Sequence, residues 1–250
     1  IKTSTNPRGG IGLSPHALYS TTPELLKLAA QESRKKNWRL TTHVAESEEE
    51  FEMFIHRRGR LFDWLKTQRD MSDCGNGSPI QQLEKLEMLS GNFLAIHVNY
   101  LTKGDAEILS KKKVSVVHCP RSHSYFRHQD FPYNELNQAG VNICLGTDSL
   151  ASVSKIRAQP MELNMFAEMK SFSATHSGLL PATILQMATQ NGARALGLSG
   201  KIGELAENSF ADLIAISFQG KITDAYEAIV KYPGDIFASM IHGEWAIPPK

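Results

Sequence analysis

The sequence contains few cysteines, little net charge and no long apolar run, and each of these absences argues against a class of protein. The three cysteines have no paired spacing, so we expect no disulfide framework and a reducing, cytoplasmic location. A net charge of +1 gives no indication of nucleic acid or an anionic membrane as a partner. No apolar run is long enough to cross a bilayer, and we expect no targeting segment at the start.

The remaining composition is that of an ordinary globular protein. With 250 residues, 41% of them hydrophobic, the chain can bury a sizeable core, and one domain or a domain with a small partner is expected. Its first residue is isoleucine and not methionine. We therefore expect that the chain begins within a longer protein.

Four runs with the character of β-strands each end in a side chain that can bind a metal or move a proton. Apolar or β-branched residues lead to His43, His97 and His118, and a fourth run over residues 141–147 leads to Asp148. Helical patterns separate the runs, and this alternation predicts a parallel sheet with helical crossovers. In a (β/α)8 barrel the carboxyl ends of the strands meet at one mouth, which carries the active site. The four side chains are therefore expected to form a metal or polar catalytic centre.

The first of these runs offers two functional groups close together in the chain. His43 ends the strand, and Glu46 follows three residues later. A metal-dependent hydrolase needs a neutral imidazole on the metal and a nearby carboxylate to move protons. Taken alone, the pair also fits a strand-end histidine beside a helix-start glutamate, and the three later runs favour the site. The acidic residues at 48–50 suit the positive end of a helix dipole, and we interpret them as solvated charges.

A further histidine, His16, lies between an early strand end and the next helix. The strand end is expected at residues 11–13, and the helix begins after Thr21 and Thr22 with Pro23 in its first turn. This position fits an ordinary polar loop residue as well as a residue at the mouth of a barrel. Both interpretations stay open at this point.

The segments that carry these residues resemble the amidohydrolase superfamily, in its chlorohydrolase-like and purine or cytosine deaminase-like branch. The matching segments are residues 14–20, 43–47, 95–98, 117–122, 145–149 and 188–196, and residues 211–214 resemble the strand that returns to the family's small β domain. The resemblance implies an α/β fold, a (β/α)8 TIM-type barrel over residues 1–200 that is incomplete at its N-terminus. It also implies that residues 201–250 return to the small β-sandwich domain.

The resemblance implies specific roles for four residues. His43 and Asp148 are expected to bind the metal, which would be one divalent transition metal, zinc or alternatively iron. Glu46 is expected to carry the proton to the leaving nitrogen, and His97 to polarise the hydroxide or the substrate. Asp148 would also accept the proton of the attacking water. A two-metal member would carry a bridging lysine near His16, and its absence favours a single-metal deaminase.

Other residues are expected to contact the substrate or to stabilise the barrel. The resemblance assigns His16, Arg121, His123 and Ser149 to substrate binding, with Arg121 and His123 on a loop over the site. The family often has asparagine where this chain has His123, which suggests a changed substrate pocket. His118, followed by cysteine and proline, is expected to be a structural strand end and not a ligand.

The implied function is hydrolytic deamination of an aminated heterocycle, of purine or pyrimidine type, by a metal-activated hydroxide. The partner would be a small-molecule substrate, and a homo-oligomer is plausible. Chlorohydrolase-type or other amidohydrolase chemistry is one alternative, and a non-catalytic scaffold or regulatory member is another. The family's first barrel strand carries His-x-His, which is absent from these 250 residues, and we expect the chain to be the C-terminal part of a longer enzyme. A phosphate-binding barrel isomerase is not favoured, because no Gly-rich phosphate loop follows the late strands.

Overall fold

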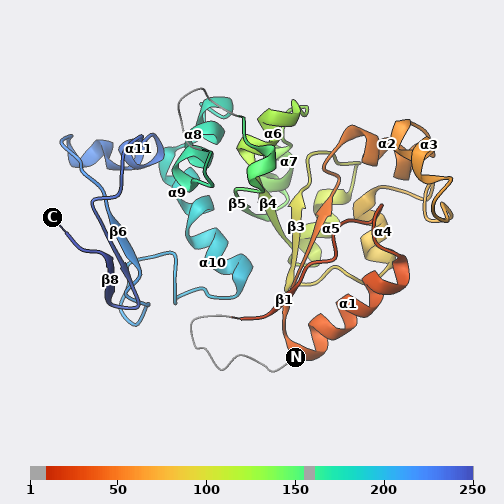
Figure 1. Cartoon of the computed structure of the whole chain (residues 1–250), viewed down its shortest axis with the longest axis horizontal. Coiled ribbons are helices and arrows are strands. Elements are labelled where there is room, and N and C mark those ends of the chain that lie inside the picture. Colours follow the sequence, from red (N-terminus) through yellow and green to blue (C-terminus); the bar gives the residue numbers. More distant parts are fainter. Residues whose placement is uncertain (1–9, 155–160, 250) are drawn as a thin grey trace. The chain divides into compact units, whose positions relative to one another are not determined.

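The computed structural model describes residues 10–154 and 161–249, which divide into two compact units. Unit 1 comprises the described residues up to 118 together with 127–143, and unit 2 comprises 119–126 and the described residues from 144 onward. Figure 1 draws both. The sequence predicts a barrel over residues 1–200 and a small β domain over residues 201–250, and this division stays a prediction.

Unit 1 alternates strands with helices, as the sequence predicts. Its elements are β1 (Gly12–Leu13), α1 (Pro23–Lys36), β2 (Arg39–Val44), α2 (Glu48–His56), α3 (Arg60–Leu65), α4 (Pro79–Lys85), β3 (Phe93–His97), α5 (Asp105–Lys111), β4 (Ser115–His118) and α7 (Tyr133–Gln138). The next strand, β5 (Asn142–Leu145), completes a five-stranded sheet in the order β1-β2-β3-β4-β5. The pairings of β1 with β2, β2 with β3 and β3 with β4 are parallel. This is the sheet expected for part of a (β/α)8 barrel.

The alternation along β2 explains why His43 is available for chemistry. Leu40, Thr42 and Val44 are buried, whereas His43 lies on the opposite, partly exposed face of the strand. The register pairs His43 with Ile96 and Val44 with His97. The two histidines therefore lie at the same end of adjacent parallel strands.

Helix α1 has the ends that its sequence predicts, and it packs on β1 and β2. The Thr22 side chain accepts a hydrogen bond from the backbone N–H of Leu25, and Pro23 occupies the first turn. Asn37 ends the helix in the left-handed conformation at φ 51°. By contrast, the polar, glycine-containing residues 57–60 and 71–78 predict a loop region, within which the structure has the short helix α3. Leu65 is the buried residue of this helix.

Unit 2 is mainly helical and contains a small antiparallel sheet. Its elements are α6 (Pro120–Phe126), the 3-10 helix η1 (Leu150–Ser152), α8 (Met165–Thr175), α9 (Pro181–Ala188), α10 (Gln190–Leu196), β6 (Leu213–Ala215), the 3-10 helix η2 (Ile222–Asp224), α11 (Ala225–Val230), β7 (Ala238–Ile241) and β8 (Glu244–Ile247). Strands β6, β7 and β8 pair in that order. Residues 237–246 predict a closing hairpin with a turn near Gly243, and this is confirmed. His242 and Gly243 have φ of 53° and 80° and form a two-residue turn.

The sequence of residues 202–204 in unit 2 predicts a short strand, and this prediction is wrong. Residues 202–204 bend and do not pair with another strand in the described part of the chain. Gly203 has φ +85° and lies so close to the carbonyl oxygen of Thr189 that an added Cβ would be 2.8 Å from it. The segment turns tightly against the junction of α9 and α10, and glycine permits both the angle and the approach.

No helix in the described ranges has the length and apolar character needed to cross a bilayer.

Candidate active site

His43 is held at the end of β2 by the loop that follows β1. Its backbone N–H donates to the carbonyl oxygen of His16 at 2.9 Å, and its Nδ1 lies 2.8 Å from the same oxygen. A carbonyl oxygen only accepts, so Nδ1 carries the proton and Nε2 carries a lone pair. This is the arrangement that metal-binding histidines have, with one ring nitrogen fixed by a carbonyl and the other available to a cation.

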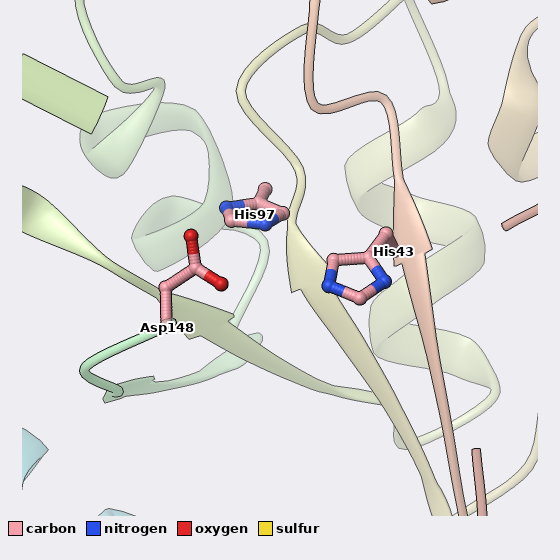
Figure 2. Close-up of side chains that lie close together, drawn as sticks. All are labelled: His43, His97 and Asp148. Carbon is pink, nitrogen blue, oxygen red and sulfur yellow. The ribbon is translucent and has the colours of Figure 1, made fainter. Parts of the chain in front are cut away.

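His97 lies beside His43 at the end of β3. Figure 2 shows the two imidazole rings projecting from the ends of their strands, with centroids 5.3 Å apart and planes inclined by 26°. The His97 side chain is buried, and its Nε2 lies 3.5 Å from Oε1 of Glu46. The φ of His97 is 75°, a conformation that non-glycine residues rarely adopt. Such outliers are common at functional sites because the surrounding structure must hold them in place.

Glu46 lies in the turn between β2 and α2, and every backbone polar group of Ala45 and Glu46 has a partner there. The N–H groups of Ala45 and Glu46 donate to Oε1 and Oε2 of Glu50, at 3.0 and 2.9 Å. The carbonyl oxygens of the same two residues accept from the backbone N–H and the side-chain Nδ2 of Asn99, at 3.0 and 2.9 Å. The sequence prediction for Glu50 is therefore wrong: it is fully buried and bonded to this turn, and only Glu48 and Glu49 are exposed.

Burial also affects the acids and the phenol around this turn. It raises the pKa of Glu50 to about 7, although the backbone N–H groups of Glu46 and Ala45 act in the opposite direction. Burial, together with the negative charges of Glu50 and Glu46, raises the pKa of Tyr19 to about 12. Tyr19 therefore stays a neutral hydrogen-bond donor near the two carboxylates at ordinary pH.

His16 is exposed and lies close to His43. Its Nδ1 is 2.5 Å from the Ser20 hydroxyl, and its ring meets Tyr19 edge-on at 5.7 Å. The ring centroid of His16 is 5.0 Å from that of His43. Burial, and then the charge of His43, lowers the pKa of His16, so the ring tends to be neutral. A neutral, exposed imidazole beside His43 is suited to hydrogen bonding with a substrate.

His118 packs at the end of β4 in the manner of a structural residue. Its ring is buried and stacks on Phe131, with centroids 3.8 Å apart and planes inclined by 18°. This stacking agrees with the expectation that His118 stabilises the strand end.

In unit 2, two buried serines orient the carboxylate of Asp148. The hydroxyls of Ser122 on α6 and Ser152 on η1 both donate to Oδ2, at 2.6 and 2.7 Å. Both serines are almost completely buried, and Asp148 itself has φ 52°. Figure 2 shows Asp148 after β5. Ser149 follows as an exposed residue whose carbonyl oxygen lies 3.0 Å from the Ser152 hydroxyl oxygen. Hydrogen bonds of this kind fix the orientation of metal-binding carboxylates in proteins.

The segment after β4, which carries Arg121 and His123, differs from the predicted loop. Residues 120–126 form the helix α6, because Pro120 suits a first helical turn and Glu168 accepts the backbone N–H of Arg121. Oε2 of Glu168 accepts from the backbone N–H of Arg121 at 2.9 Å, and the guanidinium of Arg121 lies 3.7 Å from Oε1. The Arg121 side chain also donates to the carbonyl of Glu162 at 3.0 Å. His123 is half-buried on the same helix.

The family of the chain follows from its comparison with known proteins. The model of the amidohydrolase family matches residues 1–245. The chain belongs to the amidohydrolase family. This confirms the resemblance recognised in the sequence, and with it the predicted α/β barrel class with a small β part.

Individual relatives and solved structures agree with this placement. The chain is 33% identical over 216 residues to a 5-methylthioadenosine/S-adenosylhomocysteine deaminase of Syntrophobacter fumaroxidans, covering 84% of this chain and 44% of that protein. It superposes on an adenosine deaminase from Xanthomonas campestris with bound zinc at a TM-score of 0.81 and 22% identity, covering 98% of this chain and 53% of that one. It superposes on a zinc complex of atrazine chlorohydrolase from Arthrobacter aurescens at a TM-score of 0.76 and 19% identity, covering 94% of this chain and 49% of that one. The chain spans about half the length of the curated relatives it matches.

Within this amidohydrolase, the sequence identified the strand-end residues and missed those that support them. His16, His43, Glu46 and His97 come together in unit 1, and Asp148 and Ser149 follow β5 as expected. The supporting residues Glu50, Asn99, Ser122, Ser152 and Glu168 were not predicted. Two of them, Glu50 and Glu168, occupy buried helix positions that a search for charged residues among apolar neighbours would have found.

Proposed function

We propose that this protein is a metal-dependent aminohydrolase that removes an amino group from a purine- or pyrimidine-type heterocycle by hydrolysis. The observation that carries the proposal is the placement of Nε2 of His97 3.5 Å from Oε1 of Glu46, next to the ring of His43. A carboxylate and an imidazole in this relation can move a proton between a nucleophile and a leaving group. The deaminase names of the relatives in Syntrophobacter fumaroxidans and Desulfitobacterium hafniense support the same reaction.

The residues fit a divalent transition metal. The lone pair on Nε2 of His43 and a carboxylate oxygen of Asp148 are the kinds of ligand that zinc and iron accept. We propose His43 and Asp148 as the ligands from this chain and zinc as the metal. A metal of this kind supplies Lewis acidity, which lowers the pKa of water toward neutrality.

The chain's own residues would divide the proton transfers between them. We assign to Asp148 the acceptance of a proton from the attacking water. Glu46, about one-fifth exposed in its side chain, would deliver a proton to the ring nitrogen or to the departing amine. His97, buried beside it, would hydrogen-bond through Nε2 and hold the oxygen nucleophile or the developing charge. Ammonia is the product that leaves.

Residues around these groups would bind the substrate. We propose that the exposed side chains of His16 and Ser149 contact it, and that the half-buried His123 lines its pocket. Arg121 is a different case because its guanidinium already contacts Glu168 and the Glu162 carbonyl. We propose that Arg121 contributes to substrate binding through its remaining exposed fraction, about one-fifth of the side chain.

Ammonia release and metal content together test this proposal. The protein as the cell makes it is loaded with zinc and incubated with 5′-methylthioadenosine, S-adenosylhomocysteine, adenosine and guanine. We expect ammonia from at least one substrate, about one metal ion per chain, and loss of activity with a chelator. The variant Glu46→Gln keeps the metal and loses activity. A zinc-loaded protein that releases no ammonia contradicts the proposal, and release of chloride from a chlorinated triazine in its place identifies chlorohydrolase chemistry.

Two further properties are part of the proposal. All three cysteines are buried and none forms a disulfide, which suits a reducing compartment, and we propose the cytoplasm as the location. We also propose a homo-oligomer. Cell fractionation tests the location, and light scattering of the purified protein tests the oligomeric state.

A further inference from the structure

The turn between β2 and α2 is held more tightly than a helix start requires. Ser47 is the N-cap of α2, and its hydroxyl accepts from the backbone N–H of Glu50 at 3.2 Å. In an ordinary capping box, the glutamate three residues later returns a hydrogen bond to the N-cap backbone. Here the Glu50 carboxylate instead reaches past Ser47 to the N–H groups of Ala45 and Glu46. Helix capping therefore does not account for where this side chain points.

Asn99 holds the other side of the same turn. It lies just after β3 and is 3% exposed. Its backbone N–H bonds to the carbonyl of Ala45, and its Nδ2 bonds to the carbonyl of Glu46. Glu50 and Asn99 together bind all four backbone polar groups of two consecutive residues. We call this pair the clamp.

The conformation of the turn explains why a clamp is needed. Ala45 has φ 48°, in the left-handed region that disfavours a side chain. A conformation of this kind persists only where surrounding contacts hold it. Burying a carboxylate among Met53 and Phe54 on the inner face of α2 is also unfavourable unless its oxygens are bonded. The first cost falls on Ala45 and the second on Glu50, and both residues are bonded to the turn that carries Glu46.

We propose that Glu50 and Asn99 are positioning residues that hold Glu46 in the orientation for proton transfer. The inference rests on the proposed function, because it takes Glu46 as the proton carrier. The clamp bonds hold the backbone on both sides of the Glu46 side chain, so they set the direction from which its carboxylate approaches Nε2 of His97. Small displacements of a reacting group reduce rates steeply, by up to about 100-fold for about 1 Å.

Steady-state kinetics on Glu50→Gln, measured at pH 8 on the metal-loaded full-length protein, test the functional half of the inference. Glutamine keeps the shape of the side chain but has one acceptor oxygen instead of two. We expect kcat to fall about 10- to 100-fold, with KM within about twofold and the metal content unchanged. Asn99→Ala, which removes the Nδ2 bond to the Glu46 carbonyl and keeps the backbone N–H that bonds to Ala45, is expected to act in the same direction.

Two matched controls separate positioning from stability and from charge. Glu49→Gln makes the same charge change on the exposed face of the same helix. Ser47→Ala removes the ordinary cap of α2 and leaves the clamp bonds intact. We expect both controls to retain the wild-type kcat within about twofold, and Ser47→Ala to lower the free energy of unfolding by about 1 kcal/mol.

Amide hydrogen exchange tests the clamp without any activity measurement. In Glu50→Gln we expect the Ala45 and Glu46 amides to exchange at least about tenfold faster, while the Thr42 amide within β2 is unchanged. Unchanged exchange at Ala45 and Glu46 overturns the clamp. Faster exchange with a kcat equal to that of Glu49→Gln overturns the positioning role. A metal-loaded wild-type protein that deaminates nothing overturns the proposed function, and the positioning inference with it.

Discussion

Nδ1 of His43 lies 2.8 Å from the backbone carbonyl oxygen of His16, and this contact fixes which ring nitrogen can bind a metal. The proton must lie on Nδ1 because the carbonyl has none to give. Ala17 also forms a bridge with His43, so the loop after β1 and the end of β2 are tied by backbone as well as side chain. A short loop thus sets both the direction and the tautomer of the proposed ligand.

Replacing His43 by alanine is expected to weaken zinc binding by at least about tenfold, because the Nε2 lone pair is lost. Metal titration against a competing chelator measures the change. His56→Ala, at an exposed position on α2, is the control and should bind zinc as the wild type does. Equal zinc affinity of His43→Ala and His56→Ala would remove His43 from the ligand set. Nitrogen NMR of the wild type should find His43 protonated at Nδ1.

The two serines on Asp148 lead to a second prediction. The double variant Ser122→Ala and Ser152→Ala removes both hydroxyl donors to Oδ2. We expect zinc affinity to fall about 10- to 100-fold, because the carboxylate loses the bonds that orient it. Ser124→Ala, at an exposed position of α6, is the matched control. An unchanged zinc affinity in the double variant would show that the serines serve only the packing of α6.

The strand-end residues could be predicted because strands have a short, regular period. An apolar run that ends in a histidine is visible in the sequence, and in a parallel sheet all such ends lie at one edge. His43 and His97 were found in this way, and their rings do stack. The clamp was not found, because Asn99 acts through backbone contacts across two strands, and no sequence spacing records such contacts.

The burial of Glu50 and Glu168 could have been predicted from the apolar residues on the same helix faces. Glu50 shares a helical face with Met53 and Phe54, and Glu168 shares one with Met169 and Phe172, all of them buried. A glutamate at an apolar position of a helix is expected to be buried and bonded. Glu50 was instead grouped with the acidic residues before it, since three consecutive glutamates suit the start of a helix.

Glu168 is expected to stabilise unit 2 through the start of α6. Its Oε2 accepts from the Arg121 backbone N–H, and burial raises its pKa to about 7. Glu168→Gln keeps an acceptor for this N–H, whereas Glu168→Leu removes the oxygens that face the N–H and the guanidinium of Arg121. We expect the leucine variant to be less stable than the glutamine variant by about 1–3 kcal/mol. Urea denaturation measures the difference, and equal midpoints would contradict this role.

The buried carboxyl of Glu50 predicts how stability changes with pH. Its pKa is about 7 in the folded protein and 4.5 as the ordinary value, so between these limits the folded state holds a proton that the unfolded state has released. Unfolding then becomes easier as pH rises. The contribution of Glu50 to the free energy of unfolding is complete below about pH 4.5, declines between pH 4.5 and pH 7, and is lost above about pH 7. The gap between the two values corresponds to about 3 kcal/mol.

Urea denaturation at intervals from pH 4 to pH 8 measures this dependence in the wild type, Glu50→Gln and Glu49→Gln. Glutamine does not titrate, so the free energy of unfolding of Glu50→Gln should lack the decline that Glu50 produces. Subtracting its curve from that of the wild type cancels the other titrating groups and leaves a fall of about 3 kcal/mol between pH 4.5 and pH 7. Glu49→Gln should follow the wild type, because its side chain is exposed. Parallel curves for the wild type and Glu50→Gln would mean that Glu50 ionises in the folded protein as readily as in the unfolded chain. The N–H groups of Ala45 and Glu46 would then hold it as a carboxylate.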